Sequence, residues 1–89
     1  MGITKLPQEK TYLLKRGHEE ADVRMSESLM RDFENGDERA VRSVFRRFYD
    51  VLTRQAVQDG RWWFNPPEYT SRSYRERPIF IIKEVAEKA

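Results

Sequence analysis

The segment DERAVRSVFRRFYDVLTRQAVQ, residues 37–58, decides the fold. Its apolar side chains recur at intervals of three and four residues, which is the spacing of one face of an α-helix. Asp37 precedes the first of them and is a residue type that caps helix N-termini. The segment therefore predicts a long amphipathic helix that ends at Asp59-Gly60. The apolar face consists of Ala40, Val41, Val44, Phe45, Phe48, Val51 and Leu52.

The opposite side of this predicted helix is rich in arginine. At about 100° per residue, Arg39, Arg42, Arg46 and Arg54 fall away from the apolar face. A row of guanidinium groups can bind phosphates or an acidic protein surface. The alternative is a solvated polar face, or one paired with acidic residues of the preceding helix, because charged helix faces are normal in small soluble proteins.

Upstream of this helix, the sequence predicts one strand and a shorter helix. Residues 11–16 are rich in β-branched and aromatic types and stop at Gly17, which is typical of a strand. In residues 19–34, acidic residues come first and an apolar stripe at spacings of four follows, which indicates a helix. Asn35-Gly36 ends it, and so short a joint makes the two helices a tight pair.

Downstream, the sequence predicts two more strands. Residues 61–64 read as a short strand stopped by two prolines, and residues 79–85 are the strongest strand candidate in the chain. The expected fold is therefore α+β in the order β-α-α-β-β, with a helix hairpin packed on a small antiparallel sheet. A winged-helix-like variant, with residues 61–83 as the wing, uses the same elements. We expect residues 1–10 to form a flexible arm and residues 11–89 a single domain.

Residues 61–77 interleave arginine with aromatic side chains. Aromatic rings stack on bases while arginines bind phosphates, so this composition suits a single-strand nucleic-acid binder. Protein-interface hot spots use the same residue types. In a strand, Trp62 and Trp63 point to opposite faces, so one fills the core and the other needs a loop or a partner to cover it.

The charge of the chain is unevenly distributed. Residues 1–38 carry six Lys/Arg and nine Asp/Glu (−3), and residues 39–89 carry eleven and six (+5), which together make the net charge of +2. Such asymmetry suggests an anionic partner for the second half. The alternative is that the two halves neutralise each other within one fold.

The residue types argue against an enzyme or a metal protein. The chain has no cysteine, which excludes thiol catalysis and cysteine-based zinc sites. His18 is the only histidine, and Asp22 stands where a metalloprotease helix needs a second one. The four glycines are isolated, so there is no phosphate-binding loop. We therefore expect no catalysis, no metal and no cofactor. With neither a leader nor an apolar run that could span a membrane, a cytoplasmic location is expected.

Residues 36–49, GDERAVRSVFRRFY, resemble the opening helix of region 2 in extracytoplasmic-function sigma factors. That family has a similar Gly-Asp-Glu, an apolar pair, and Arg-Arg before aromatic residues, and the resemblance implies a transcription-related partner. In the family, a helix that reads and melts promoter DNA follows, whereas here two prolines and a predicted strand follow. We take the likeness as convergence on an amphipathic helix start.

Together these features predict a non-catalytic accessory or regulatory protein that contacts another protein or a larger assembly. The alternative is a small DNA- or RNA-binding domain that uses the same residues. Dedicated DNA binders usually carry a larger basic excess than this chain, so a protein partner is favoured. Self-association is also compatible with the sequence, and no membrane partner is expected. The predicted contact residues are Arg39, Arg42, Arg46, Arg54, Arg61, Trp62, Trp63, Tyr69, Arg72, Tyr74, Arg75 and Arg77.

Overall fold

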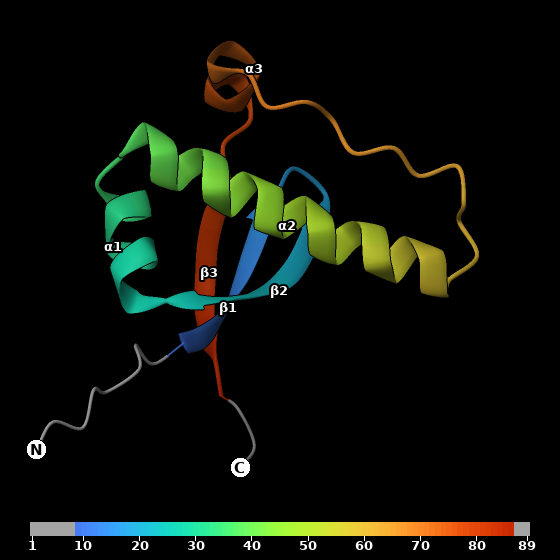
Figure 1. Cartoon of the computed structure of the whole chain (residues 1–89), viewed down its shortest axis with the longest axis horizontal. Helices are drawn as coiled ribbons and strands as arrows, with labels where there is room; N and C mark the ends of the chain where they lie inside the picture. The colour runs from blue at the N-terminus through green and yellow to red at the C-terminus, as the bar shows by residue number, and fades with distance from the viewer. Residues whose placement is uncertain (1–8, 87–89) are drawn as a thin grey trace, which may run out of the picture.

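A computed structural model of the chain describes residues 9–86, which form an α+β domain with a three-stranded antiparallel sheet (Figure 1). The sheet has the strand order β2-β1-β3, so the first strand lies between the other two. The elements in chain order are β1 (Glu9–Arg16), β2 (Glu19–Ser26), α1 (Glu27–Glu34), α2 (Glu38–Gln58), α3 (Ser71–Glu76) and β3 (Phe80–Val85).

The long predicted helix is confirmed as α2. The Asp37 side chain accepts a hydrogen bond from the backbone N–H of Ala40 at 3.1 Å, which satisfies one of the free donors at the helix start. The helix ends at Gln58, and Gly60, two residues later, has a φ of 76° in the left-handed region that glycine tolerates. The predicted apolar face is turned inward, and Phe48 and Val44 on it are fully buried.

The first predicted helix is wrong in its N-terminal half, because residues 19–26 form strand β2. Buried Ala21, Val23 and Met25 alternate with exposed residues, which is the period of a half-buried strand. The acidic residues at the start of this segment therefore belong to a strand and not to a first helical turn. Strands β1 and β2 form a hairpin that pairs Arg16 with Glu19.

The prediction of two helices joined at Asn35-Gly36 is confirmed, but the first helix is shorter than predicted. Helix α1 covers only residues 27–34. Ser26 caps α1 by accepting a hydrogen bond from the Leu29 N–H at 3.1 Å, and Met30 and Phe33 are buried. The observed order of elements is β-β-α-α-α-β, and the predicted order β-α-α-β-β is wrong.

Residues 61–64 do not form the predicted strand, so the winged-helix variant lacks one strand of its wing. The Phe64 N–H donates to the Arg61 carbonyl at 3.0 Å, which closes a tight turn directly after α2. Residues 65–70 are irregular, and they lead into the short helix α3, which was not predicted from the sequence. Strand β3 confirms the last predicted strand and pairs Ile81 with Leu14 of β1. Residues 9 and 10 of the expected arm belong to β1, and the rest of that arm lies outside the described residues.

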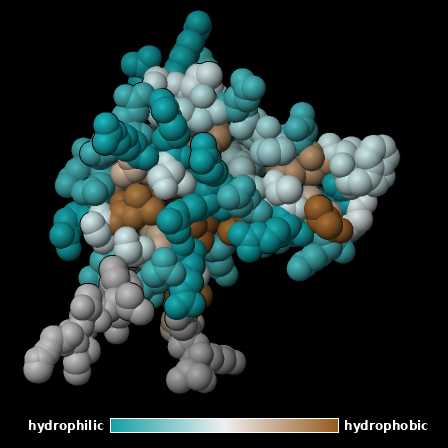
Figure 2. Space-filling model, viewed as in Figure 1, coloured by the Kyte–Doolittle hydropathy of each residue, from teal (hydrophilic) through white to brown (hydrophobic). Residues whose placement is uncertain are grey.

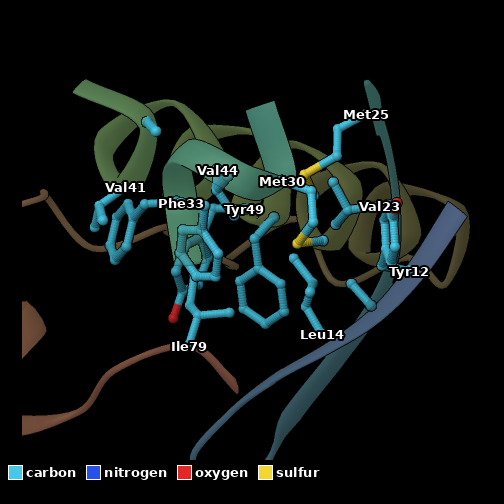
Figure 3. Close-up of a cluster of buried hydrophobic side chains, with 14 of the residues drawn as sticks. Tyr12, Leu14, Val23, Met25, Met30, Phe33, Val41, Val44, Tyr49 and Ile79 are labelled. Carbon is cyan, nitrogen blue, oxygen red and sulfur yellow. The ribbon is translucent and has the colours of Figure 1, made fainter. Parts of the chain in front are cut away.

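One hydrophobic core lies between the sheet and the helices α1 and α2, which cover one face of it (Figure 1). Figure 3 shows side chains from both strands of the hairpin and from both helices directed toward one another. Ile79, just before β3, is also buried there and joins the C-terminal part of the chain to the core. On the opposite side of α2, Arg39, Arg42 and Arg46 are exposed.

Candidate functional site

Three of the predicted arginines lie together on the solvent side of α2. Arg39, Arg42 and Arg46 are all exposed, because the opposite side of the helix packs into the core. Arg42 forms an ion pair with Glu38 at 3.6 Å. Within residues 9–86, Arg39 and Arg46 form no ion pair. This part of α2 therefore carries more positive charge than its own surroundings neutralise.

Residues 65–70, which follow α2, turn back along the helix and pack beside these arginines. The Tyr69 ring packs edge-on against Phe45 of α2, with 5.3 Å between the ring centres. The guanidinium carbon of Arg42 lies 5.4 Å from the centre of the Tyr69 ring, which is a cation–π distance. Tyr69 is half-buried, so this predicted contact residue also has a structural role.

A groove runs between α2 and the returning segment. It has a volume of about 470 Å³, and Pro66, Pro67 and Tyr69 form its apolar wall. Arg42 and Arg46 line it together with Asp50 and Glu68, so both signs of charge are present. A smaller, shallow surface pocket of about 240 Å³ shares the same two arginines and is lined only by Arg39, Arg42, Ser43 and Arg46. The smaller pocket has no acidic lining residue and is the more basic of the two.

Trp62 and Trp63 are both exposed, at 85% and 64% of their surface. The expectation that one of them fills the core is wrong, because the segment is a turn and Phe64 is its half-buried member. The two indole rings contact each other edge to face, with 5.8 Å between their centres. The two rings form an exposed tryptophan patch that follows the C-terminal end of α2, and Val57 in the last turn of α2 is exposed as well. In Figure 2, pale and brown side chains gather at that end of a largely hydrophilic surface.

The remaining predicted contact residues are not gathered at one place. Arg54 is exposed further along α2 than the groove, and Arg61 pairs with Asp59 at 3.4 Å. Arg72 and Arg75 are exposed on α3, while Tyr74 is turned toward the protein interior. The Tyr74 hydroxyl accepts a hydrogen bond from the Ile79 N–H at 3.2 Å, and burial raises its pKa.

Sequence reasoning missed a buried arginine, Arg16, which is only 5% exposed. Its Nε donates to the Arg77 carbonyl at 2.7 Å, and its Nη1 donates to the Tyr49 hydroxyl at 2.9 Å. The guanidinium carbon lies 5.1 Å from the centre of the Phe45 ring. The alternation of residues 11–16 was a usable signal, because it places Arg16 on the same face of β1 as buried Tyr12 and Leu14.

Within residues 9–86, no carboxylate contacts Arg16 directly. The Glu19 carboxylate is instead linked to Arg16 through the Tyr49 hydroxyl. The Tyr49 hydroxyl donates to Glu19 Oε1 at 2.6 Å while it accepts from Arg16. Burial, followed by the hydrogen bond to Glu19, raises the pKa of Tyr49. These groups line a polar cavity of about 520 Å³ together with Ser73, Glu76 and Arg77. Two arginines and two glutamates balance there, so the cavity has no net preference for an anion.

Neither a metal site nor a membrane span is found in the described part of the chain. Residues 9–86 contain no group of three or more histidine, aspartate or glutamate side chains that could hold a metal ion. His18 lies exposed in the turn between β1 and β2. No helix in the same range is long and apolar enough to cross a membrane. Comparison with protein-family models, with curated proteins and with solved structures finds no match to this chain.

Proposed function

We propose that this chain is a non-catalytic binding module that contacts another protein through the exposed tryptophan pair and the arginine side of α2. The observation that carries the proposal is the exposure of Trp62 and Trp63 in a domain that buries most of its other large apolar side chains. An indole ring that is held in water forgoes the favourable free energy of burial. A partner that covers both rings recovers it.

The tryptophan pair has the properties of an interface hot spot. Tryptophan and arginine are the residue types most enriched among residues whose removal weakens binding. The edge-to-face contact restricts both rings before binding, so less side-chain entropy is lost when a partner covers them. Val57, in the last turn of α2, is a further exposed apolar side chain.

The arginine side of α2 supplies charge complementarity in addition to the tryptophan pair. Arg39, Arg42 and Arg46 favour an acidic surface on the partner, which speeds association and selects among partners. Asp50 and Glu68 line the groove beside these arginines, and they disfavour a continuous nucleic-acid backbone that follows it. This mixture of charges supports a protein partner over DNA or RNA.

The test is a capture experiment with the whole chain as bait in a lysate of its natural host, with and without nuclease. We expect a discrete protein that survives nuclease treatment and moderate salt. The double variant Trp62→Ala/Trp63→Ala should lose it, because both side chains are exposed and their removal leaves the core intact. The matched control is Ile82→Ala, which removes an exposed apolar side chain from β3.

Two results would contradict the proposal. If the bait recovers mainly nucleic acid that is released as salt rises, then the arginine and aromatic side chains serve nucleic-acid binding. If the tryptophan variant captures the same protein as well as the control does, then the exposed rings are not the contact surface. Far-ultraviolet circular dichroism of each variant verifies that the bait is folded.

A further inference from the structure

We infer that the pocket of Arg39, Arg42, Ser43 and Arg46 binds a phosphate monoester carried by a phosphorylated side chain of the protein partner. This inference rests on the proposed function and deepens it, because it names the group that the arginine side of α2 recognises. The pocket is distinct from the tryptophan patch, which lies at the other end of the same helix.

The charge count of the pocket favours a phosphate over a single carboxylate. Three arginines line it without any acidic residue, and only Arg42 has an ion-pair partner, Glu38. Among the lining residues and their ion-pair partner, three positive charges less one negative charge leave an excess of two, because Asp50 and Glu68 line the adjacent groove and not this pocket. A phosphate monoester carries about −1.5 to −2 at neutral pH, whereas a carboxylate carries −1. The doubly charged group therefore matches the pocket, and a carboxylate leaves one guanidinium uncompensated.

The donors in the pocket also suit a phosphate. Guanidinium groups bind phosphate oxygens through paired, charge-assisted hydrogen bonds, and a phosphate offers several acceptor oxygens. Arg39, Arg42 and Arg46 stand at intervals of three and four residues, so their side chains leave the same side of two successive helical turns. Half-buried Ser43 lies between them and adds a hydroxyl donor.

One of the three arginines is positioned before any ligand arrives. The Glu38 carboxylate that forms the ion pair with Arg42 also accepts a hydrogen bond, at 3.2 Å, from the Ser71 hydroxyl at the start of α3. The same guanidinium lies at a cation–π distance from the Tyr69 ring. A side chain that is already held loses less conformational entropy on binding, so Arg42 is the preorganised member of the site.

The larger groove borders this pocket and provides a place for the group that carries the phosphate. Both cavities share Arg42 and Arg46, and the groove beyond them has the apolar wall of Pro66, Pro67 and Tyr69. A phosphate on a ring or on another apolar carrier can therefore fill the pocket while its carrier lies against this wall. Free inorganic phosphate leaves the wall uncovered.

The test uses the full-length, isotope-labelled chain and follows its backbone amide signals by nuclear magnetic resonance. Phenyl phosphate is the probe, and benzoate and inorganic phosphate are compared with it at constant ionic strength. We expect saturable shifts in residues 39–46 and 66–69 with phenyl phosphate, and affinity about tenfold weaker for each of the other two. Absence of saturable shifts in residues 39–46, or equal affinity for benzoate or inorganic phosphate, would overturn the inference.

Variants separate the pocket from general positive charge. Arg46→Ala should weaken phenyl phosphate binding about tenfold or more, because it removes a charge-assisted contact. Arg54→Ala is the matched control, since it removes an exposed arginine of the same helix that lines neither cavity. Equal losses in the two variants would show attraction to net charge alone and would overturn the inference.

Phosphatase treatment of the lysate distinguishes this inference from the proposed function. If the captured protein is lost after phosphatase treatment and retained in a mock-treated sample, the phosphate inference is supported. If capture is unchanged by phosphatase yet lost in the tryptophan double variant, the phosphate inference is wrong while the binding module stands. If no protein is captured under either condition, the proposed function itself is wrong.

Discussion

Replacing Tyr49 with phenylalanine removes one hydroxyl group and should destabilise the whole domain. That hydroxyl accepts a hydrogen bond from Arg16 and donates one to Glu19, and hydrogen bonds to charged groups contribute about 1.5–3 kcal/mol each. Water can replace the bond at Glu19, which is half-exposed, but it has little access to the 5% exposed Arg16. We therefore expect the free energy of unfolding to fall by about 2–3 kcal/mol.

This loss is large for a chain of 89 residues. At roughly 0.05–0.15 kcal/mol per residue, its total stability is about 4–13 kcal/mol. Urea unfolding followed by far-ultraviolet circular dichroism measures the change. Tryptophan fluorescence is a poor reporter here, because Trp62 and Trp63 are already exposed in the folded state.

The matched control for this prediction is Tyr69→Phe. The Tyr69 hydroxyl makes no hydrogen bond to any of residues 9–86, so its removal should change the free energy of unfolding by less than about 0.5 kcal/mol. Equal unfolding midpoints for the two variants would refute the bridging role of Tyr49. A double-mutant cycle with Arg16→Met should give a coupling energy within the range of about 0.5–3 kcal/mol seen for residues in one network.

Two further predictions concern the core and the alkaline limit of stability. Phe48→Ala should lower the free energy of unfolding by about 3–5 kcal/mol in urea titrations, because Phe48 is fully buried. If the variant unfolds at the same urea concentration as the wild type, the assignment of Phe48 to the buried face of α2 is wrong. Burial raises the pKa of Tyr12, Tyr49 and Tyr74 above their ordinary value of 10.0. The stability that these buried, protonated tyrosines contribute is therefore fully present below pH 10.0 and is lost as pH rises through their folded-state pKa values. A tyrosinate absorbance titration in parallel with circular dichroism should show this loss.

The sequence predicted α2 well because its signals agreed with one another. The apolar period, the Asp37 cap and the glycine at the end all pointed to the same helix, and consistent local signals are the most reliable ones. The arginine side of α2 followed directly from the same geometry. The groove beside it could not be predicted, because it depends on how residues 65–70 return along the helix. An irregular segment has no regular spacing of apolar residues from which its path could be predicted.

The error in residues 19–26 has a specific physical cause. Acidic residues favour the first turn of a helix, but they are equally suited to the solvent face of a strand, and Glu20 and Asp22 lie on that face. The alternation with Ala21, Val23 and Met25 was the stronger signal. Gly17-His18 was a second signal, since Gly17 adopts a φ of 61° in the turn of the hairpin.

The exposed tryptophans illustrate a different limit of sequence reasoning. Their residue type predicts burial, and only the tight turn at Arg61–Phe64 explains why neither ring reaches the core. A tertiary contact of Phe64 settles the orientation of this turn. Local propensity contains no information about such a contact, which joins the segment to residues far away in the chain.

The central position of β1 has a consequence for how the chain acquires its structure during synthesis. Thr11 of β1 pairs with Val85 of β3, and 85 − 11 places the partners 74 positions apart. Closing so long a loop is slow compared with forming the β1–β2 hairpin and the helices α1 and α2, because their contacts join residues that are close in the sequence. A nascent chain can therefore assemble residues 9–60 on the ribosome, while one edge of β1 stays open until the C-terminal strand emerges. An unpaired strand edge is a template for pairing with another chain, so this interval is when the protein is most exposed to aggregation.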